Sequence, residues 1–126
     1  MPRGTLHIFA IEGKSLKNVE FLGKSDPYLV LHVDSAYKQQ TDSKKDTLNP
    51  AWQQRFTFDI YEGNNELLLE CFDKESHGKD ELIGSTSIPL DEVFGTDTEV
   101  DKWYTIQDKK GKDCGEIHLA LKFARQ

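Results

Sequence analysis

Carboxylate side chains gather in two short stretches of this sequence. The first stretch spans residues 13–26, and the second spans residues 73–81. Together they hold Glu20, Asp26, Asp73, Glu75, Asp80 and Glu81. Like charges held within a few ångströms repel one another unless a proton or a cation neutralises them. Ca²⁺ is a hard cation that takes oxygen ligands in flexible geometry, so these residues favour it if the two stretches meet in the fold.

The same residues also have a purely structural interpretation. Two acidic loops that face solvent are a common way to keep a β-sandwich soluble. The spacing of the carboxylates alone does not choose between solvated loops and a cation site.

The two acidic stretches follow segments in which apolar and polar residues alternate. Alternation with a period of two is typical of half-buried strands. Clear examples are segments 5–11, 29–33, 55–60, 67–71 and 116–123. Weaker strand candidates are 37–42, 85–88 and 102–106, and the best short helical candidate is 90–94. Turn residues punctuate the chain about every 8–12 residues, which predicts an all-β sandwich or barrel with both loops at one end if their strands are neighbours.

The composition limits the size and the class of the protein. The chain has 126 residues and a net charge of −6, which predicts a single domain over residues 1–126. The acidic balance argues against a nucleic-acid partner and, at first sight, against an anionic membrane. No apolar run is long enough to span a bilayer or to form a secretory signal. Two cysteines do not make a disulfide framework, so we expect a cytoplasmic protein with reduced thiols.

The sequence lacks the motifs of the common enzyme classes. It has no G-x-S-x-G elbow, no P-loop, no G-x-G-x-x-G turn and no His pair at metal-binding spacing. Cys71 lies on an apolar strand face and is predicted to be buried and inert, whereas Cys114 could be exposed. The sequence therefore favours a binding module over an enzyme.

Three motifs in order along the chain are similar to those of a known family. Residues 23–28 read GKSDPY, residues 47–52 read TLNPAW, and residues 71–75 read CFDKE, with LIG following at 82–84. They resemble the motifs of C2 domains, and the resemblance covers essentially the whole chain. It implies an eight-stranded antiparallel β-sandwich that, in many members, binds phospholipid membranes in response to Ca²⁺.

The order of the strands resembles the phospholipase-type (type II) version of this family. The strand at 5–11 leads directly into the first acidic loop, and the strand at 116–123 closes the chain. Residues 1–4 are too few for an earlier strand, so we expect none ahead of Thr5.

The resemblance also implies which residues hold the ion. Carboxylates stand at all five matching ligand positions, and the backbone carbonyls of Phe21 and Lys74 would complete the shell. The matching carboxylates are Glu20, Asp26, Asp73, Glu75 and Glu81. Three of them are Glu where the family has mostly Asp, so their carboxylates reach one methylene further, but every position keeps its charge. Ca²⁺ is therefore the expected cofactor.

Apolar residues at the loop tips are the expected lipid contacts. In resembling domains, side chains at the positions of Phe21 and Leu22 enter the headgroup region, and His77 stands at the tip of the later loop. The alternative for Phe21 and Leu22 is that they fold back as a cap on a small core. The expected partner is an anionic phospholipid membrane, which places the protein at the membrane periphery.

Two further alternatives remain open from the sequence. Some relatives bind phosphoinositides through lysines on a strand pair, and the matching stretch here carries Lys38, Lys44 and Lys45 between Asp42 and Asp46. These lysines serve equally well as a solvated face. The Glu residues at ligand positions also leave open a calcium-independent scaffold on the same fold that binds a protein partner.

Overall fold

Alternating burial along the strands builds the fold. The computed structural model describes residues 3–126, so that residues 1 and 2 of the predicted domain lie outside the described part. The strands are β1 (Gly4–Lys14), β2 (Pro27–His32), β3 (Lys38–Gln40), β4 (Ala51–Ile60), β5 (Glu66–Asp73), β6 (Glu81–Pro89), β7 (Val100–Gln107) and β8 (Asp113–Arg125). One helical turn, α1 (Asp91–Phe94), joins β6 to β7. The prediction of an all-β protein with eight strands is confirmed, as is the short helix.

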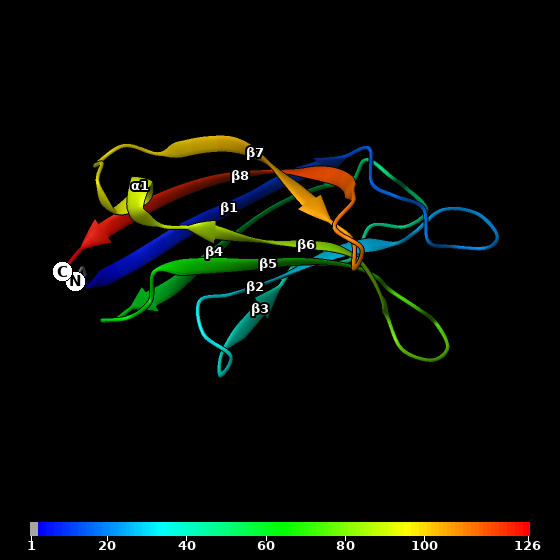
Figure 1. Cartoon of the computed structure of the whole chain (residues 1–126), viewed down its shortest axis with the longest axis horizontal. Helices are drawn as coiled ribbons and strands as arrows, with labels where there is room; N and C mark the ends of the chain where they lie inside the picture. Colours follow the sequence, from blue (N-terminus) through cyan, green and yellow to red (C-terminus); the bar gives the residue numbers. More distant parts are fainter. Residues whose placement is uncertain (1–2) are drawn as a thin grey trace.

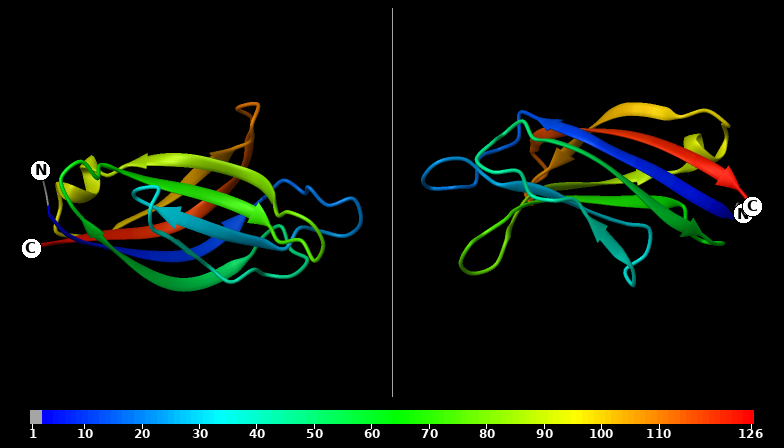
Figure 2. Two further views of the ribbon diagram at one scale, coloured as in Figure 1. Left: turned by 90° about the horizontal axis from the view of Figure 1, so that it is seen from below. Right: turned by 180° about the vertical axis from the view of Figure 1, so that it is seen from behind.

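The strands pair in the order β3-β2-β5-β6-β7-β8-β1-β4, and every pairing is antiparallel. The sheet folds over where β6 meets β7 at the pair Ser85 and Gln107, which gives two layers that face each other (Figures 1 and 2). β1 lies between β4 and the last strand, β8. This is the order predicted for the phospholipase-type topology.

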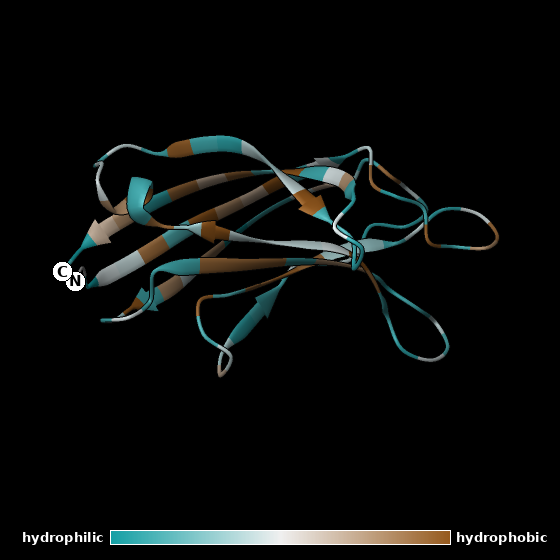
Figure 3. Ribbon diagram, viewed as in Figure 1, coloured by the Kyte–Doolittle hydropathy of each residue, from teal (hydrophilic) through white to brown (hydrophobic). Residues whose placement is uncertain are grey.

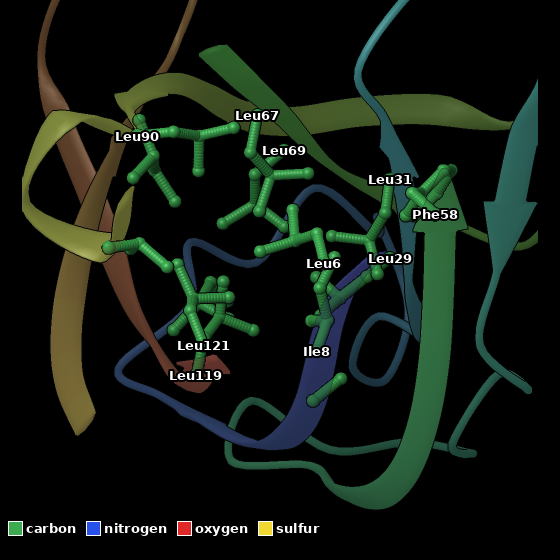
Figure 4. Packing of buried hydrophobic residues seen from close by; sticks show 14 of the residues in the cluster. Leu6, Ile8, Leu29, Leu31, Phe58, Leu67, Leu69, Leu90, Leu119 and Leu121 are labelled. Carbon is green, nitrogen blue, oxygen red and sulfur yellow. The ribbon is translucent and has the colours of Figure 1, made fainter. Parts of the chain in front are cut away.

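The core fills the space between the two layers. Leu6 and Ile8 of β1 meet Leu29 and Leu31 of β2 across this space, and all four side chains are buried (Figure 4). In Figure 3 apolar (brown) segments lie along most of the strands, whereas β3 is hydrophilic and the first acidic loop is partly apolar. Burial of such side chains is the main favourable contribution to folding, at about 1.5–3 kcal/mol for each large apolar residue.

Two details differ from the sequence prediction. Val33 was expected on the same strand as Leu29, but β2 ends at His32 and Val33 is a partly buried residue packed against the core. Cys114 is buried rather than exposed, and its thiol donates to the carbonyls of Ile83 and Ile106. Burial raises the pKa of the Cys114 thiol, so it has no reactive character.

The loops and the chain ends lie at opposite ends of the sandwich. The segments 15–26, 41–50 and 74–80 all emerge at one end, and both termini lie at the other (Figure 1). Within residues 3–126 there is no helix with the length and apolar character needed to cross a membrane. The fold therefore presents three neighbouring loops on a rigid support.

Candidate functional site

Strand register brings the two acidic loops together. Asp73 is the last residue of β5, and it pairs with Pro27 of β2 on one side and with Glu81 of β6 on the other. The backbone N–H of Asp26 donates to Asp73 Oδ1 at 2.7 Å, and the N–H of Lys74 donates to the Asp26 carbonyl at 3.0 Å. The bases of the first and second acidic loops are thus joined directly, with Asp73 at their junction.

Three carboxylates converge at this junction. Oxygens of Glu20, Asp73 and Glu75 lie within 4.8 Å of one another. The close approach of the Asp73 carboxylate to Glu20, and then that of Glu75, raises the pKa of Glu20 from 4.5 to about 8. A raised pKa is what crowded carboxylates show when no cation balances them.

Asp73 provides the test of whether this cluster suits a cation. Its side chain is buried, and Oδ2 has no hydrogen-bond partner among the described residues 3–126. A buried acceptor without a donor costs about 1–3 kcal/mol, and a bound ion is one way in which proteins satisfy such an atom. An oxygen-only donor set with one unsatisfied buried oxygen fits Ca²⁺.

Asp26 and Glu81, two of the expected ligands, take other places. Asp26 Oδ1 accepts the backbone N–H of Asp46 at 2.7 Å, which ties the first acidic loop to segment 41–50. Asp46 in turn accepts the N–H of Lys24 at 2.8 Å. Glu81 is exposed at the start of β6, directly across from Asp73. The carboxylates of Asp26 and Glu81 therefore lie beside the cluster of Glu20, Asp73 and Glu75 but are not part of it.

Asp80 acts as a support for the second loop. Its carboxylate accepts the backbone N–H of Glu75 at 2.8 Å and the hydroxyl of Tyr28 at 2.5 Å, with the Lys74 ammonium 3.8 Å away. These hydrogen bonds lower the pKa of Asp80, and the bond from the Glu75 backbone has the largest effect. Asp80 therefore holds Glu75 in position at the cluster.

Asn18 and Ser25 shape the first loop, and sequence reasoning missed both. Asn18 Oδ1 accepts the N–H of Glu20 at 3.1 Å, while its amide donates to the carbonyl of Gly23 at 2.8 Å. The buried Ser25 hydroxyl accepts the N–H of Val19 at 3.2 Å. The sequence does contain a signal for Asn18, because it stands two residues ahead of Glu20, a candidate ligand. Asn side chains often accept a hydrogen bond from the backbone two residues later and so stabilise a tight turn.

The tip of the first loop is apolar and open to solvent. Phe21 is 98% exposed and Leu22 is 82% exposed, which excludes the alternative that they cap a core. Gly23 follows with φ of +79°, a conformation that glycine adopts readily and that turns the chain back. His77 is exposed in the later loop beside Gly78.

The expected basic face is divided. Lys38 lies on β3 opposite His32, at one end of β2, whereas the backbone N–H of Lys44 donates to the carbonyl of Pro27 at the other end. Lys45 follows Lys44 in the same loop and is exposed. The three lysines therefore do not form one compact patch.

The sequence of this chain is similar to those of several known proteins. A sequence model of the C2 domain family matches residues 4–106. The chain is 32% identical over 98% of its length to the 16 kDa phloem protein 2 of Arabidopsis thaliana, and it covers 83% of that protein. It is 33% identical over 97% of its length to a calcium-dependent lipid-binding protein of Arabidopsis thaliana, of which it spans 25%.

A solved structure gives the same result in three dimensions. A calcium-bound pair of C2 domains from extended synaptotagmin 2 superposes with a TM-score of 0.83 at 32% identity, over 98% of this chain and 46% of that one. Fold, motifs and sequence similarity agree, and the chain belongs to the C2 domain family.

Proposed function

We propose that this chain is a calcium-responsive module that binds anionic phospholipid membranes peripherally and catalyses no reaction. The observation that carries the proposal is the adjacency of two features in one loop. Glu20 joins the carboxylate cluster, and Phe21 and Leu22 follow it with almost fully exposed side chains. Exposed apolar residues beside a cluster of negative charge suit a surface that meets lipid only after the charge is balanced.

Glu20, Asp73 and Glu75 are the residues that would hold Ca²⁺, with Asp26, Glu81 and the carbonyls of Phe21 and Lys74 as further donors. Bound Ca²⁺ would offset the carboxylate charge and present a positive centre to lipid phosphates. Two similar proteins support the proposal: one is named a calcium-dependent lipid-binding protein, and one solved structure is calcium bound. A cytoplasmic position at the membrane surface follows from this function.

Calorimetric titration with Ca²⁺ tests the ion site. Wild-type protein should release or absorb heat on binding, and Asp73→Asn should bind at least ten-fold more weakly because an uncharged amide NH₂ replaces the buried unsatisfied oxygen. Asn keeps an oxygen that can accept the N–H of Asp26, so the loop junction is preserved. The matched control is Asp97→Asn, an exposed carboxylate in the segment between α1 and β7. Absence of heat from wild-type protein at millimolar Ca²⁺ would contradict the proposal.

A further inference from the structure

We propose that the hairpin between β7 and β8 forms a second binding site, specific for phosphomonoester groups on lipid headgroups, beside the calcium loops. This inference rests on the proposed membrane function, because it assumes that the loop end of the sandwich faces the bilayer. It assigns a role to lysines that belong to none of the expected sites.

The site is a surface depression of about 480 Å³. Three elements line it: Lys17 and Val19 from the first loop, Glu81–Ile83 at the start of β6, and the hairpin tip. The tip contributes Lys109, Lys110 and Lys112. The depression therefore collects four lysines from two separate segments of the chain.

The hairpin is ordered by its own acidic residue. Asp108 Oδ1 accepts the backbone N–H groups of Lys110 at 2.9 Å and Lys112 at 3.1 Å, and Oδ2 lies 3.4 Å from Lys17 Nζ. Hydrogen bonding from the backbone of Lys112 is the main reason that the pKa of Asp108 is lowered. The carboxylate of Asp108 is thereby committed to the turn and to Lys17.

The three tip lysines keep their charge available. Lys109, Lys110 and Lys112 are exposed, and within residues 3–126 none has a carboxylate within 4.0 Å. Asp113, the other acid on the hairpin side, accepts a hydrogen bond from the Gln107 amide at 3.2 Å. The remaining acid of the depression is Glu81, which borders the calcium cluster.

The position of the depression suits a headgroup that the calcium loops have brought close. Glu81 lines it and pairs with Asp73, so the depression and the cluster share one strand position. The hairpin projects sideways from the flank of the sandwich, on the half that carries the acidic loops (Figure 2). A site on the side of the sandwich can contact phosphates that project from the bilayer surface, such as those on an inositol ring. The phosphodiester that links the headgroup to the glycerol lies deeper in the bilayer and is harder for this site to reach.

Lysine ammonium groups suit this ligand because each is a compact point charge with rotatable donors. Each lysine that hydrogen-bonds a phosphomonoester oxygen strengthens binding about five-fold, and phosphatidylserine carries no such group. Loss of two tip lysines should therefore weaken binding about 25-fold where phosphomonoesters are present.

The experiment compares two double variants on two kinds of vesicle in the presence of Ca²⁺. Lys109→Gln/Lys110→Gln removes two tip charges, and the control Lys102→Gln/Lys122→Gln removes two exposed charges on strands that lie away from the loops. One vesicle contains phosphatidylserine, and the other contains phosphatidylinositol 4,5-bisphosphate at the same total charge. We expect the hairpin variant to lose about 25-fold on the second vesicle and less than three-fold on the first, with the control unchanged on both.

Equal losses by both variants, or no loss by the hairpin variant, would overturn the proposal. Failure of wild-type protein to bind phosphatidylserine vesicles with Ca²⁺ would contradict the proposed function instead. In that case, titration with soluble inositol 1,4,5-trisphosphate in the absence of vesicles tests the hairpin site. Amide shifts at Lys109–Lys112 in wild-type protein that disappear in the hairpin variant would support the site, and no shifts would overturn it.

Discussion

Asp73 combines structural and ligand roles in one side chain. Its Oδ1 joins the two acidic loops through the N–H of Asp26, while its buried Oδ2 has no partner within residues 3–126. A residue in this state is tolerated where function needs it, because the unsatisfied atom lowers stability. We expect Ca²⁺ binding to depend on the charge of Asp73 and not on its shape. Asn is therefore the informative replacement, because it keeps the shape of the side chain and removes the charge.

Phe21 and Leu22 should contribute to lipid binding without affecting the ion. Burial of each side chain in the headgroup region contributes about 1.5–3 kcal/mol at most. The double variant Phe21→Ala/Leu22→Ala should therefore bind vesicles at least ten-fold more weakly at saturating Ca²⁺, with an unchanged calorimetric Ca²⁺ titration. The control Tyr37→Ala/Tyr61→Ala removes two other exposed aromatic side chains, 59% and 53% exposed. Full binding by the Phe21 and Leu22 variant would remove these residues from the proposed contact.

At the scale of the elements, Gly84 allows the two layers to close over Cys114. A Cβ atom on Gly84 would lie 2.2 Å from Cys114 Sγ and 3.1 Å from the carbonyl oxygen of Gln107. Gly84→Ala should lower the free energy of unfolding by about 1–3 kcal/mol through overpacking, measured by urea denaturation. Gly95→Ala is the control, since its nearest contact would be an ordinary 3.4 Å. Equal stability of Gly84→Ala and wild-type protein would contradict this packing.

His118 links three strands on the outer face of the layer formed by β7, β8, β1 and β4. Its Nε2 lies 2.5 Å from Asp101 of β7, its Nδ1 lies 3.3 Å from Glu12 of β1, and its ring stacks on Trp103. Partial burial lowers the pKa of His118, but hydrogen bonds to Asp101 and Glu12 outweigh this effect, so the pKa lies above 6.5. The ring is therefore more readily protonated in the folded than in the unfolded chain.

A raised pKa makes the contribution of His118 depend on pH in one direction. The stabilisation is fully present below the unfolded value of 6.5 and is lost as the pH rises through the higher folded value. The stability advantage of wild-type protein over His118→Gln should thus be larger at pH 5.5 than at pH 9, by about 1 kcal/mol. Urea denaturation at both pH values measures it, and His7→Gln, an exposed position on β1, is the control. An advantage that grows with pH would refute the assignment.

Sequence periodicity predicted most of the elements because most of the clear strands bury one face, although β2 is buried along its whole length. The short strand β3 was only a weak candidate, since Lys38–Gln40 carries no apolar residue and is held by pairing with β2. The burial of Cys114 depends on the space above Gly84, a contact between distant positions in the chain that no local pattern reveals. The convergence of Glu20 and Asp73 was predictable from loop placement, but the separate role of Asp26 depends on its bond to Asp46.

For the molecule as a whole, the placement of charge changes the meaning of its sum. The six loop carboxylates have a formal charge of −6, which equals the entire formal net charge of the chain. The remainder of the chain is formally neutral, and the hairpin lysines add a local positive region at the same end. An acidic protein can therefore approach an anionic membrane once the loop charge is balanced. The hairpin would then meet the phosphates of the same surface.

Co-sedimentation with phosphatidylserine vesicles, with Ca²⁺ and with a chelator, tests the central claim most directly. Wild-type protein should sediment with the vesicles in Ca²⁺ and remain in the supernatant with the chelator, and Asp73→Asn should remain in the supernatant under both conditions. Sedimentation that is the same with Ca²⁺ and with the chelator would contradict a calcium-responsive membrane module.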